Sequence, residues 1–185
     1  MTVPRLLMMA QPPPGVRQAL LAALRRQGLE ARLGRRMFPA RNWHQTLSDR
    51  YVDSPGNRAG LLRAGARLSA RASTLIFNCI RDQAGGGLIH WAFRAKCEPG
   101  FAALLAAVQE VLAGEGFGTG SGHAPHLTLS YDAPDRLGSM AIEPVAWRID
   151  ELLLVVGGAS SPYHYDVLGR WPLLPPEPDP QLSLF

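Results

Sequence analysis

The sequence predicts an α+β protein of two similar lobes, each an antiparallel sheet with outer helices, arranged around a central groove. Two β-rich runs flank a glycine-rich turn at residues 83–87, which indicates a hairpin. No glycine-rich strand-to-helix phosphate fingerprint is present, so a doubly wound parallel sheet is disfavoured. The pattern His-Xaa-Thr-Leu-Ser occurs twice, at residues 44–48 and 126–130, and the elements around the two copies follow a similar order.

The first half of the chain reads as a strand, a helix, a motif strand and a second helix. Three prolines end the first strand, and apolar residues at helical spacing follow them until Gly28. Ser54-Pro55 predicts the start of the second helix. In chain order we expect a strand at 5–10, a helix from 16 to about 28, a basic stretch at 32–36, a motif strand near 43–48 and a helix at 54–68.

The second half reads as a hairpin, a helix, the second motif strand and two closing strands. Its helix shows the clearest periodicity of the chain, with apolar residues between Phe101 and Leu112, and a glycine-rich stretch at 114–122 ends it. The expected strands lie at 73–81, 88–95, 126–130, 145–156 and 163–173.

The length of 185 residues suits one domain of two lobes, which we place at residues 1–174. No apolar run approaches the roughly 20 residues of a membrane span, and the start is too short and proline-rich for a signal peptide. Cys79 and Cys97 lack a C-x-x-C spacing, so we expect reduced, mostly buried thiols. These features predict a cytoplasmic protein, and we expect a monomer.

Charge is distributed unevenly along the chain. Residues 1–71 carry a net charge of +10, whereas residues 72–185 carry −6. A half this basic favours a polyanionic partner such as a nucleic acid or nucleotide. The alternative is that the arginines form a solvated face, and that the preference for arginine over lysine reflects genomic base composition.

The repeated pattern has a direct chemical interpretation. In a strand, residues two apart point to the same face, so each copy presents an imidazole beside a hydroxyl, while the intervening residue, Gln45 or Leu127, and the following leucine face the core. His44 and His126 would then act as general acid and general base, since histidine titrates near neutral pH. Thr46 and Thr128 would donate hydrogen bonds to the non-bridging oxygens of a phosphate. The alternative is that both histidines are structural.

The remaining histidines give weaker signals. His123 and His126 form an H-x-x-H pair without a clear set of Cys, Asp or Glu partners, so we expect no metal site and no cofactor. His90 lies in an apolar strand and is interpreted as a packed residue. His164, between two tyrosines, could line the groove.

Several segments carry a family resemblance. Besides the first strand and its proline-rich turn, they are Trp43–Leu47, Gly116-Phe117, Pro125–Leu129 and Tyr165–Leu173. With them the chain, over about residues 3–174, resembles the two-histidine phosphoesterase superfamily, and within it the 2′-5′ RNA ligase, or RNA 2′,3′-cyclic phosphodiesterase, family.

This resemblance implies a bilobal α+β fold and metal-free chemistry on RNA or nucleotides with 2′,3′-cyclic phosphates or 2′-5′ linkages. It implies that His44 is the acid for the 2′ oxygen and that His126 is the base that activates water. The implied product is a 2′-phosphate end, and the implied reverse activity is 2′-5′ ligation.

Two positions depart from the family pattern. Ser48-Asp49-Arg50-Tyr51 follows the first motif in place of Phe-Leu-Gly, and Tyr131 stands after the second motif, where relatives often carry an arginine. Arg50 would supply the missing cation from the other lobe, or it is a surface residue. We expect both Arg50 and Tyr131 to contact substrate.

The end of the chain changes in composition. Residues 175–180 are rich in proline and predict a stiff linker. The last five residues, 181–185, resemble the bacterial sliding-clamp-binding motif, with Gln181, Leu182, Leu184 and Phe185 as the contacting side chains. The alternative is a tail that folds onto its own body. This peptide also supports a second hypothesis for the protein, a nucleic-acid-binding accessory protein recruited to the clamp.

Overall fold

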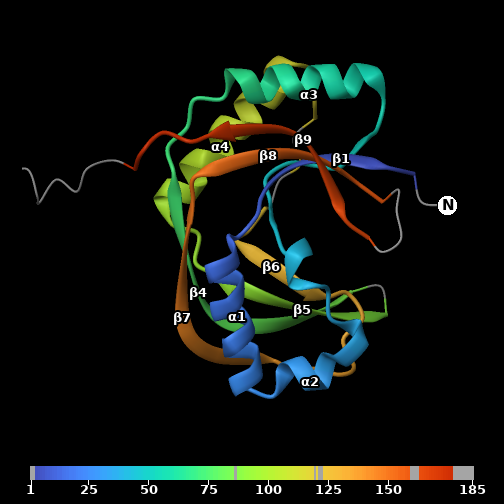
Figure 1. The fold of residues 1–185 in the computed structure, drawn as a ribbon, viewed down its shortest axis with the longest axis vertical. Coiled ribbons are helices and arrows are strands. Elements are labelled where there is room, and N and C mark those ends of the chain that lie inside the picture. The colour runs from blue at the N-terminus through green and yellow to red at the C-terminus, as the bar shows by residue number, and fades with distance from the viewer. Residues whose placement is uncertain (1–2, 86, 119, 121–122, 159–162, 177–185) are drawn as a thin grey trace, which may run out of the picture.

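Two antiparallel sheets form the body of the molecule in the computed structural model, which describes residues 3–176 except 86, 119, 121–122 and 159–162. Figure 1 shows one sheet above the other. The strands are β1 (Arg5–Ala10), β2 (Gln45–Thr46), β3 (Tyr51–Val52), β4 (Ser73–Gly85), β5 (Leu88–Ala95), β6 (His126–Ser130), β7 (Ser139–Ile149), β8 (Glu151–Gly157) and β9 (Tyr165–Pro172). The helices are α1 (Pro14–Arg26), α2 (Leu29–Leu33), α3 (Pro55–Arg67) and α4 (Pro99–Gly114), with 3-10 turns η1 (Gly34–Arg36) and η2 (Ala40–Asn42).

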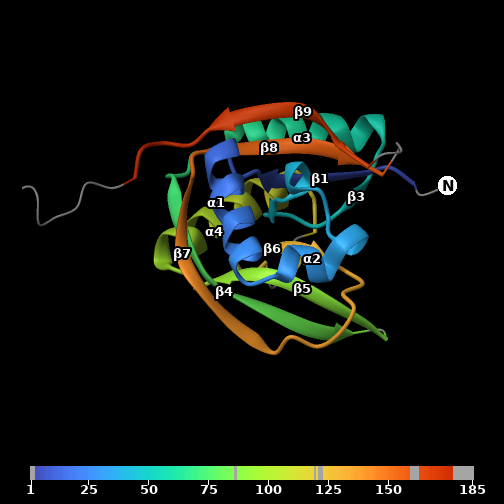
Figure 2. The same ribbon diagram turned by 60° about the horizontal axis from the view of Figure 1, so that its bottom comes forward.

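The helices pack on both sheets. The first sheet has the order β2-β1-β8-β9, with β3 also paired to β1, and the second has the order β6-β5-β4-β7. Helix α3 packs on β8 and β9 of the first sheet, and α4 packs on α3 and on β4 of the second sheet. Helix α1 packs on β7 of the second sheet, with α2 beside it (Figures 1 and 2). The predicted α+β architecture of two antiparallel lobes is confirmed.

The lobes do not correspond to the two halves of the sequence. The first sheet combines β1, β2 and β3 with β8 and β9 from the other end of the chain. The single closing strand expected at 145–156 is in fact β7 and β8, which separate at Asp150 and join different sheets. The two strands also differ in burial: β7 alternates between exposed and buried residues, whereas nearly all of β8 is buried.

The helix boundaries follow their local signals. Prolines open α1, α3 and α4, and the Ser54 side chain accepts a hydrogen bond from the Asn57 backbone N–H at 3.2 Å. Gly28 has a φ of +68°, which suits the residue that separates α1 from α2. Helix α2 was not predicted, because the buried Leu29 and Leu33 are surrounded by arginines.

The first motif forms much less strand than expected. Only Gln45 and Thr46 pair with β1, opposite Ala10 and Met9, and His44 lies outside the strand. The Leu47 N–H still donates to the Met8 carbonyl at 2.9 Å, but the Met8 N–H donates to the Ser48 hydroxyl at 2.8 Å instead of to a backbone carbonyl. The chain bends there before β3 pairs further along the same strand.

Many arginines of the basic first half pair with acids of the second half. Arg32 bonds Asp135 at 2.7 Å, and Arg63 bonds Glu115 at 2.9 Å. Arg36 and Arg67 make similar pairs with Asp132 and Glu115. Exposed pairs of this kind contribute little to stability, but they neutralise part of the charge that the sequence assigned to a polyanionic partner.

Two smaller expectations have different outcomes. Cys79 and Cys97 are free thiols, but Cys97 is exposed and Cys79 is only partly buried, so the expected burial was wrong. Cys97 follows the end of β5, where the chain leaves the sheet. None of the helices in the described part of the chain has the length and apolar character needed to cross a membrane.

Candidate active site

The second motif forms a regular strand that sorts its side chains onto two faces. His126 and Thr128 are partly exposed, whereas Leu127 and Leu129 are fully buried. This alternation places the imidazole and the hydroxyl on the same face of β6, as the spacing predicted. The first motif shows the same alternation: Gln45 and Leu47 are buried, and Thr46 between them is partly exposed, although most of this motif is not strand.

Both motif histidines are anchored in the same way. The Nδ1 of His44 lies 2.8 Å from the carbonyl oxygen of Asn42, and the Nδ1 of His126 lies 2.7 Å from that of Ala124. Since a carbonyl only accepts, each Nδ1 carries the proton and donates. The tautomer is therefore fixed, and each Nε2 is left to accept a proton when the ring is neutral or to donate one when it is charged.

The Leu-Ser part of the repeat is structural. Leu47 and Leu129 are both 0 % exposed and belong to the core. Ser48 bonds the backbone of β1, and the Ser130 hydroxyl accepts the backbone N–H of Asp132 at 3.1 Å. Each serine thus holds the turn that follows its histidine and threonine.

Gln45 connects the two motifs directly. Its side chain is 0 % exposed, and its Oε1 accepts the backbone N–H of His126 at 2.8 Å. Its Nε2 donates to the backbone carbonyl of Thr46 at 2.8 Å. The residue between the first histidine and threonine therefore fixes the start of β6 against β2. Sequence reasoning placed this side chain in the core but did not find its bond to the other motif.

A cavity of about 280 Å³ opens beside His44. It brings together His44 and Thr128 from different motifs, and it is also lined by Arg50 and Tyr131, the two residues that we expect to contact substrate. Thr46 and His126 do not line this cavity. The rest of the wall was not predicted and consists of Phe38, Pro39, Arg41, Asn42, Tyr163 and Tyr165.

Tyrosines form one side of the cavity. The rings of Tyr163 and Tyr165 meet edge to face at 5.2 Å, and His44 packs edge to face on Tyr165 at 5.1 Å. Gly157 makes room for them, because a Cβ there would come within 2.5 Å of the Tyr163 hydroxyl. His164 was expected as a possible lining residue, but it is outside the lining and pairs with Asp166 at 3.1 Å. Its two tyrosine neighbours line the cavity instead.

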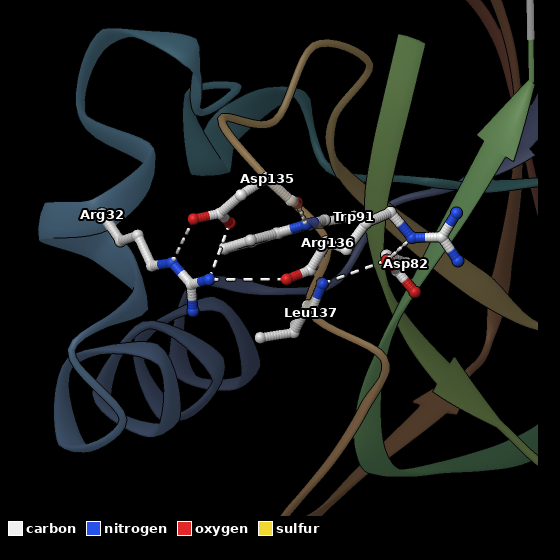
Figure 3. Close-up of polar contacts among 6 residues, drawn as sticks. All are labelled: Arg32, Asp82, Trp91, Asp135, Arg136 and Leu137. Carbon is white, nitrogen blue, oxygen red and sulfur yellow. Dashed lines mark hydrogen bonds and ion pairs between the residues drawn. The ribbon is translucent and has the colours of Figure 1, made fainter. Parts of the chain in front are cut away.

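The loop after the second motif is braced on both sides. Figure 3 shows Arg32 bonded to Asp135, and Asp82 bonded to Arg136 and to the backbone N–H of Leu137. The Trp91 indole N–H also donates to the Asp135 carbonyl at 3.0 Å. Burial opposes ionisation of Asp82, but the backbone N–H groups and Arg136 outweigh it and lower the pKa of this carboxyl.

Tyr131 begins this braced loop and is itself held by ring contacts. Its ring meets Phe38 edge to face at 5.2 Å and His90 at 5.1 Å. His90 is therefore not simply packed in a strand, because it supports a wall of the cavity. The restrained loop keeps Tyr131 at the rim, where its ring is 42 % exposed.

Burial sets the protonation of the two histidines. Desolvation, together with the charges of Arg50 and His126, lowers the pKa of His44 to about 4, although the hydrogen bond to Asn42 opposes this shift. Desolvation also lowers the pKa of His126, with smaller contributions from Arg94 and His123. His44 and His126 are thus near enough to repel each other when charged, and both are neutral at pH 7 in the free protein.

The described residues do not group three or more His, Cys, Asp or Glu side chains as ligands for a metal ion. His123, the other member of the H-x-x-H pair, lies 3.6 Å from Asp49, whose carboxylate also accepts the Gly120 N–H at 2.7 Å. The predicted clamp-binding side chains, Gln181, Leu182, Leu184 and Phe185, lie outside the described residues.

The arrangement therefore offers two proton-transfer groups with fixed tautomers and an adjacent aromatic cavity. Thr128 and Arg50 add a hydroxyl and a cation to its wall. Such a set can hold an anion and move protons on either side of it.

No protein-family model matches the chain, and no curated protein does. Solved structures do match. A protein described as a phosphoesterase is 21% identical with a TM-score of 0.73, covering 93% of this chain and 99% of its own. LigT of E. coli in apo form is 22% identical with a TM-score of 0.70 and the same coverage.

TT0787 of Thermus thermophilus is 24% identical with a TM-score of 0.69, covering 91% of this chain and 97% of its own. The two-lobed α+β fold implied by the sequence resemblance is therefore confirmed, and this chain shares it with the phosphoesterase, LigT and TT0787 structures.

Proposed function

We propose that the protein is a metal-independent RNA 2′,3′-cyclic phosphodiesterase that opens the cyclic phosphate to a 2′-phosphate. The observation that carries the proposal is the matched anchoring of His44 and His126, which leaves both Nε2 atoms for proton transfer. The shared fold supports a phosphoesterase, and crystal structures of E. coli LigT hold 3′-AMP and phosphate.

The reaction balances with two histidines. One neutral Nε2 accepts a proton from water as the water oxygen attacks phosphorus. The bond from phosphorus to O3′ breaks, and the other, protonated Nε2 donates to O3′. Because a 2′-phosphate product keeps its bond to O2′, the acid serves O3′ rather than the 2′ oxygen expected from the resemblance. A 2′-5′ ligation would use the same two groups: a 5′ hydroxyl gives its proton to the base and attacks phosphorus in place of water, the bond from phosphorus to O3′ breaks, and the acid protonates O3′.

The resemblance assigns His44 as the acid and His126 as the base. A general acid must carry the proton, and a protonated histidine is positively charged. Burial disfavours this charged form of His44 in the free protein and lowers its pKa to about 4. The negative phosphate must therefore compensate the imidazolium when substrate binds. Thr46 and Thr128 donate to the non-bridging oxygens, and Arg50 adds a positive charge at the cavity wall.

The cavity beside His44 suits the nucleoside that carries the phosphate. Its aromatic residues offer faces and edges for a base, and base–aromatic stacking contributes about 1–3 kcal/mol per base. Asn42 helps to hold this wall, because its side-chain Nδ2 donates to the backbone carbonyl of Tyr163 at 2.9 Å.

The test is hydrolysis of adenosine 2′,3′-cyclic phosphate, and of an RNA ending in a cyclic phosphate, in the presence of EDTA. We expect turnover to continue and the product to be the 2′-phosphate, identified by chromatography against both isomers. A strict requirement for an added metal ion, or a 3′-phosphate product, contradicts the proposal. Binding of RNA without turnover favours the nucleic-acid-binding accessory protein.

We further propose that the final peptide recruits the protein to the bacterial sliding clamp. The observation that favours this role concerns the last part of the described chain. Leu174 exchanges backbone hydrogen bonds with Ala70 and Ala72, and none of these three residues lines the cavity beside His44. Docking through residues 181–185 is thus compatible with catalysis. Deleting these five residues should abolish binding to purified clamp in calorimetry and leave hydrolysis unchanged. Unaltered clamp affinity rules the docking role out.

A further inference from the structure

The face of the second sheet that carries His126 continues across two more strands. Arg94 on β5 pairs directly with His126, and Ala92 pairs with Thr128. On β4, Cys79 pairs with Arg94 and Arg81 pairs with Ala92. Residues directly opposite in an antiparallel ladder point to the same face. Arg94 and Arg81 therefore extend from the sheet on the side of His126 and Thr128.

A groove of about 540 Å³ follows this face. Arg81, Arg94 and Lys96 line it, and so do Ala124 and Pro125, the two residues immediately before His126. The groove thus begins at the second motif and runs across β5 to β4. It shares no lining residue with the aromatic cavity beside His44.

The two arginines of the groove lack acidic partners. Within the described residues neither has a carboxylate in ion-pair distance, and each bonds a neutral side chain: Arg81 to Ser139 at 3.3 Å and Arg94 to Gln83 at 3.2 Å. Burial, and then the charge of Arg81, lower the pKa of Arg94. Arg94 is partly buried and Arg81 is exposed, and two guanidinium groups that repel each other gain stability when an anion binds between them.

The acids near the groove do not neutralise this pair. Asp82 lines the groove, but its carboxylate is 3 % exposed and is already bound by Arg136 and the Leu137 N–H (Figure 3). Glu98 lies 3.5 Å from Lys96, which is itself largely exposed. Several arginines of the basic first half, in contrast, bond a carboxylate: Arg25, Arg32, Arg36, Arg58, Arg63 and Arg67. Unneutralised positive charge therefore collects beside the second motif.

We propose that this groove is a second anion site, where Arg81 and Arg94 bind a backbone phosphate of the RNA strand whose reacting phosphate lies between His44 and His126. The inference rests on the proposed function and adds a specificity to it. The terminal nucleoside occupies the aromatic cavity, and the preceding nucleotides follow the groove. The protein then distinguishes an oligonucleotide from a mononucleotide through a site that takes no part in proton transfer.

The experiment compares two substrates, adenosine 2′,3′-cyclic phosphate and a twelve-nucleotide RNA with a terminal 2′,3′-cyclic phosphate. For Arg81→Gln, and more strongly for the Arg81→Gln/Arg94→Gln double variant, we expect kcat/KM on the RNA to fall at least about tenfold relative to kcat/KM on the mononucleotide. The salt dependence of RNA binding should lose about 0.7 of its logarithmic slope for each phosphate contact removed.

A matched control removes the same charge elsewhere. Arg26 and Arg35 are exposed on α1 and η1, outside the groove, so Arg26→Gln/Arg35→Gln should leave the ratio of the two kcat/KM values unchanged. An equal loss on both substrates in the groove variants means that the arginines act on His126 alone and overturns the site. An unchanged ratio, or an equal effect of the control, overturns it as well.

A binding measurement separates this inference from the proposed function. The same RNA ending in a 2′-phosphate is titrated with protein, and binding is followed by fluorescence anisotropy. Weaker binding by the groove variants than by the control supports the site even when the wild-type protein hydrolyses neither substrate. Loss of hydrolysis alone, with identical RNA affinities, contradicts the groove and leaves the catalytic assignment standing.

Discussion

The surroundings of His44 and His126 differ, although the two motifs share the His-Xaa-Thr-Leu-Ser pattern and the same Nδ1 anchor. His44 lies against Tyr165 beside an aromatic cavity, and burial lowers its pKa to about 4. His126 begins a strand whose neighbours carry Arg94 and Arg81 toward a basic groove. The comparison shows that a duplicated motif repeats the chemical groups, whereas the unrelated walls around each copy determine what binds beside it.

The largest expected effect comes from removing either imidazole. His44→Ala and His126→Ala should each lower kcat by about 10²–10⁴-fold or more, because each deletes one proton-transfer group. The double variant should lose much less than the product of the two losses, since the groups act on one reaction. Steady-state assays on the cyclic mononucleotide measure this. His164→Ala, a histidine outside the cavity lining, is the control and should retain activity. Substantial activity in either motif variant would falsify the two-histidine mechanism.

Removing the link between the motifs should have the next largest effect. Gln45→Leu leaves the His126 N–H and the Thr46 carbonyl without their side-chain partner in a buried site. We expect kcat to fall by about 10–100-fold from misplacement of the histidines, and the free energy of unfolding to fall by about 1–3 kcal/mol.

Two measurements separate positioning from stability for Gln45. Gln45→Glu keeps the acceptor for the His126 N–H and should recover part of kcat where the chain remains folded. The pH dependence of kcat should shift in Gln45→Leu, because the environment of His126 changes. A loss of stability with an unchanged kcat and pH profile would reduce Gln45 to a core residue.

A smaller effect is expected at the aromatic wall. Tyr131→Ala should raise KM for the cyclic mononucleotide by about 5–150-fold, because stacking on one ring is worth about 1–3 kcal/mol. Tyr131→Phe keeps the ring and its contacts with Phe38 and His90, so its KM should stay near the wild-type value. If KM rises equally in the Tyr131→Ala and Tyr131→Phe variants, the hydroxyl rather than the ring contacts the substrate.

The smallest effect is on stability against pH. The pKa of His44 is about 4 in the folded protein against about 6.5 when unfolded. The unfolded chain therefore binds more protons between these values, and stability falls as pH decreases through this window. We expect about 1–2 kcal/mol of the free energy of unfolding to be lost between pH 7 and pH 5 from this group.

Urea denaturation at both pH values measures this loss. His44→Ala should flatten the dependence more than His126→Ala, since His44 is the more deeply buried of the two. If the free energy of unfolding depends on pH equally in both variants, burial affects the protonation of the two histidines to the same extent. That result would contradict the difference in pKa between His44 and His126.

Local patterns predicted the parts of the site that depend on neighbours in sequence. The two-residue period of β6 placed His126 and Thr128 together, because a single strand determines which side chains share a face. Gln45 was assigned to the core correctly, but its bond to His126 depends on the contact between two sheets. The pairing of His164 with Asp166, and the place of Tyr163 and Tyr165 in the cavity, likewise depend on tertiary packing.

The lobes show the same limit at a larger scale. The hairpin, the helix starts and β1 follow from turn residues, capping and periodicity. The return of β8 and β9 to the sheet of β1 is a pairing between opposite ends of the chain, which no local window contains. The charge of the first half was similarly misleading, because bonds such as Arg32 to Asp135 form only when distant segments meet.

The most direct test of the account is a crystal structure of the protein with bound inorganic phosphate. We predict one phosphate between the motifs, within hydrogen-bond distance of the Nε2 atoms of both His44 and His126, with the hydroxyls of Thr46 and Thr128 donating to its oxygens. A phosphate bound by only one histidine, or held elsewhere while this position stays without it, would contradict the claim that the two motifs act on a single phosphate.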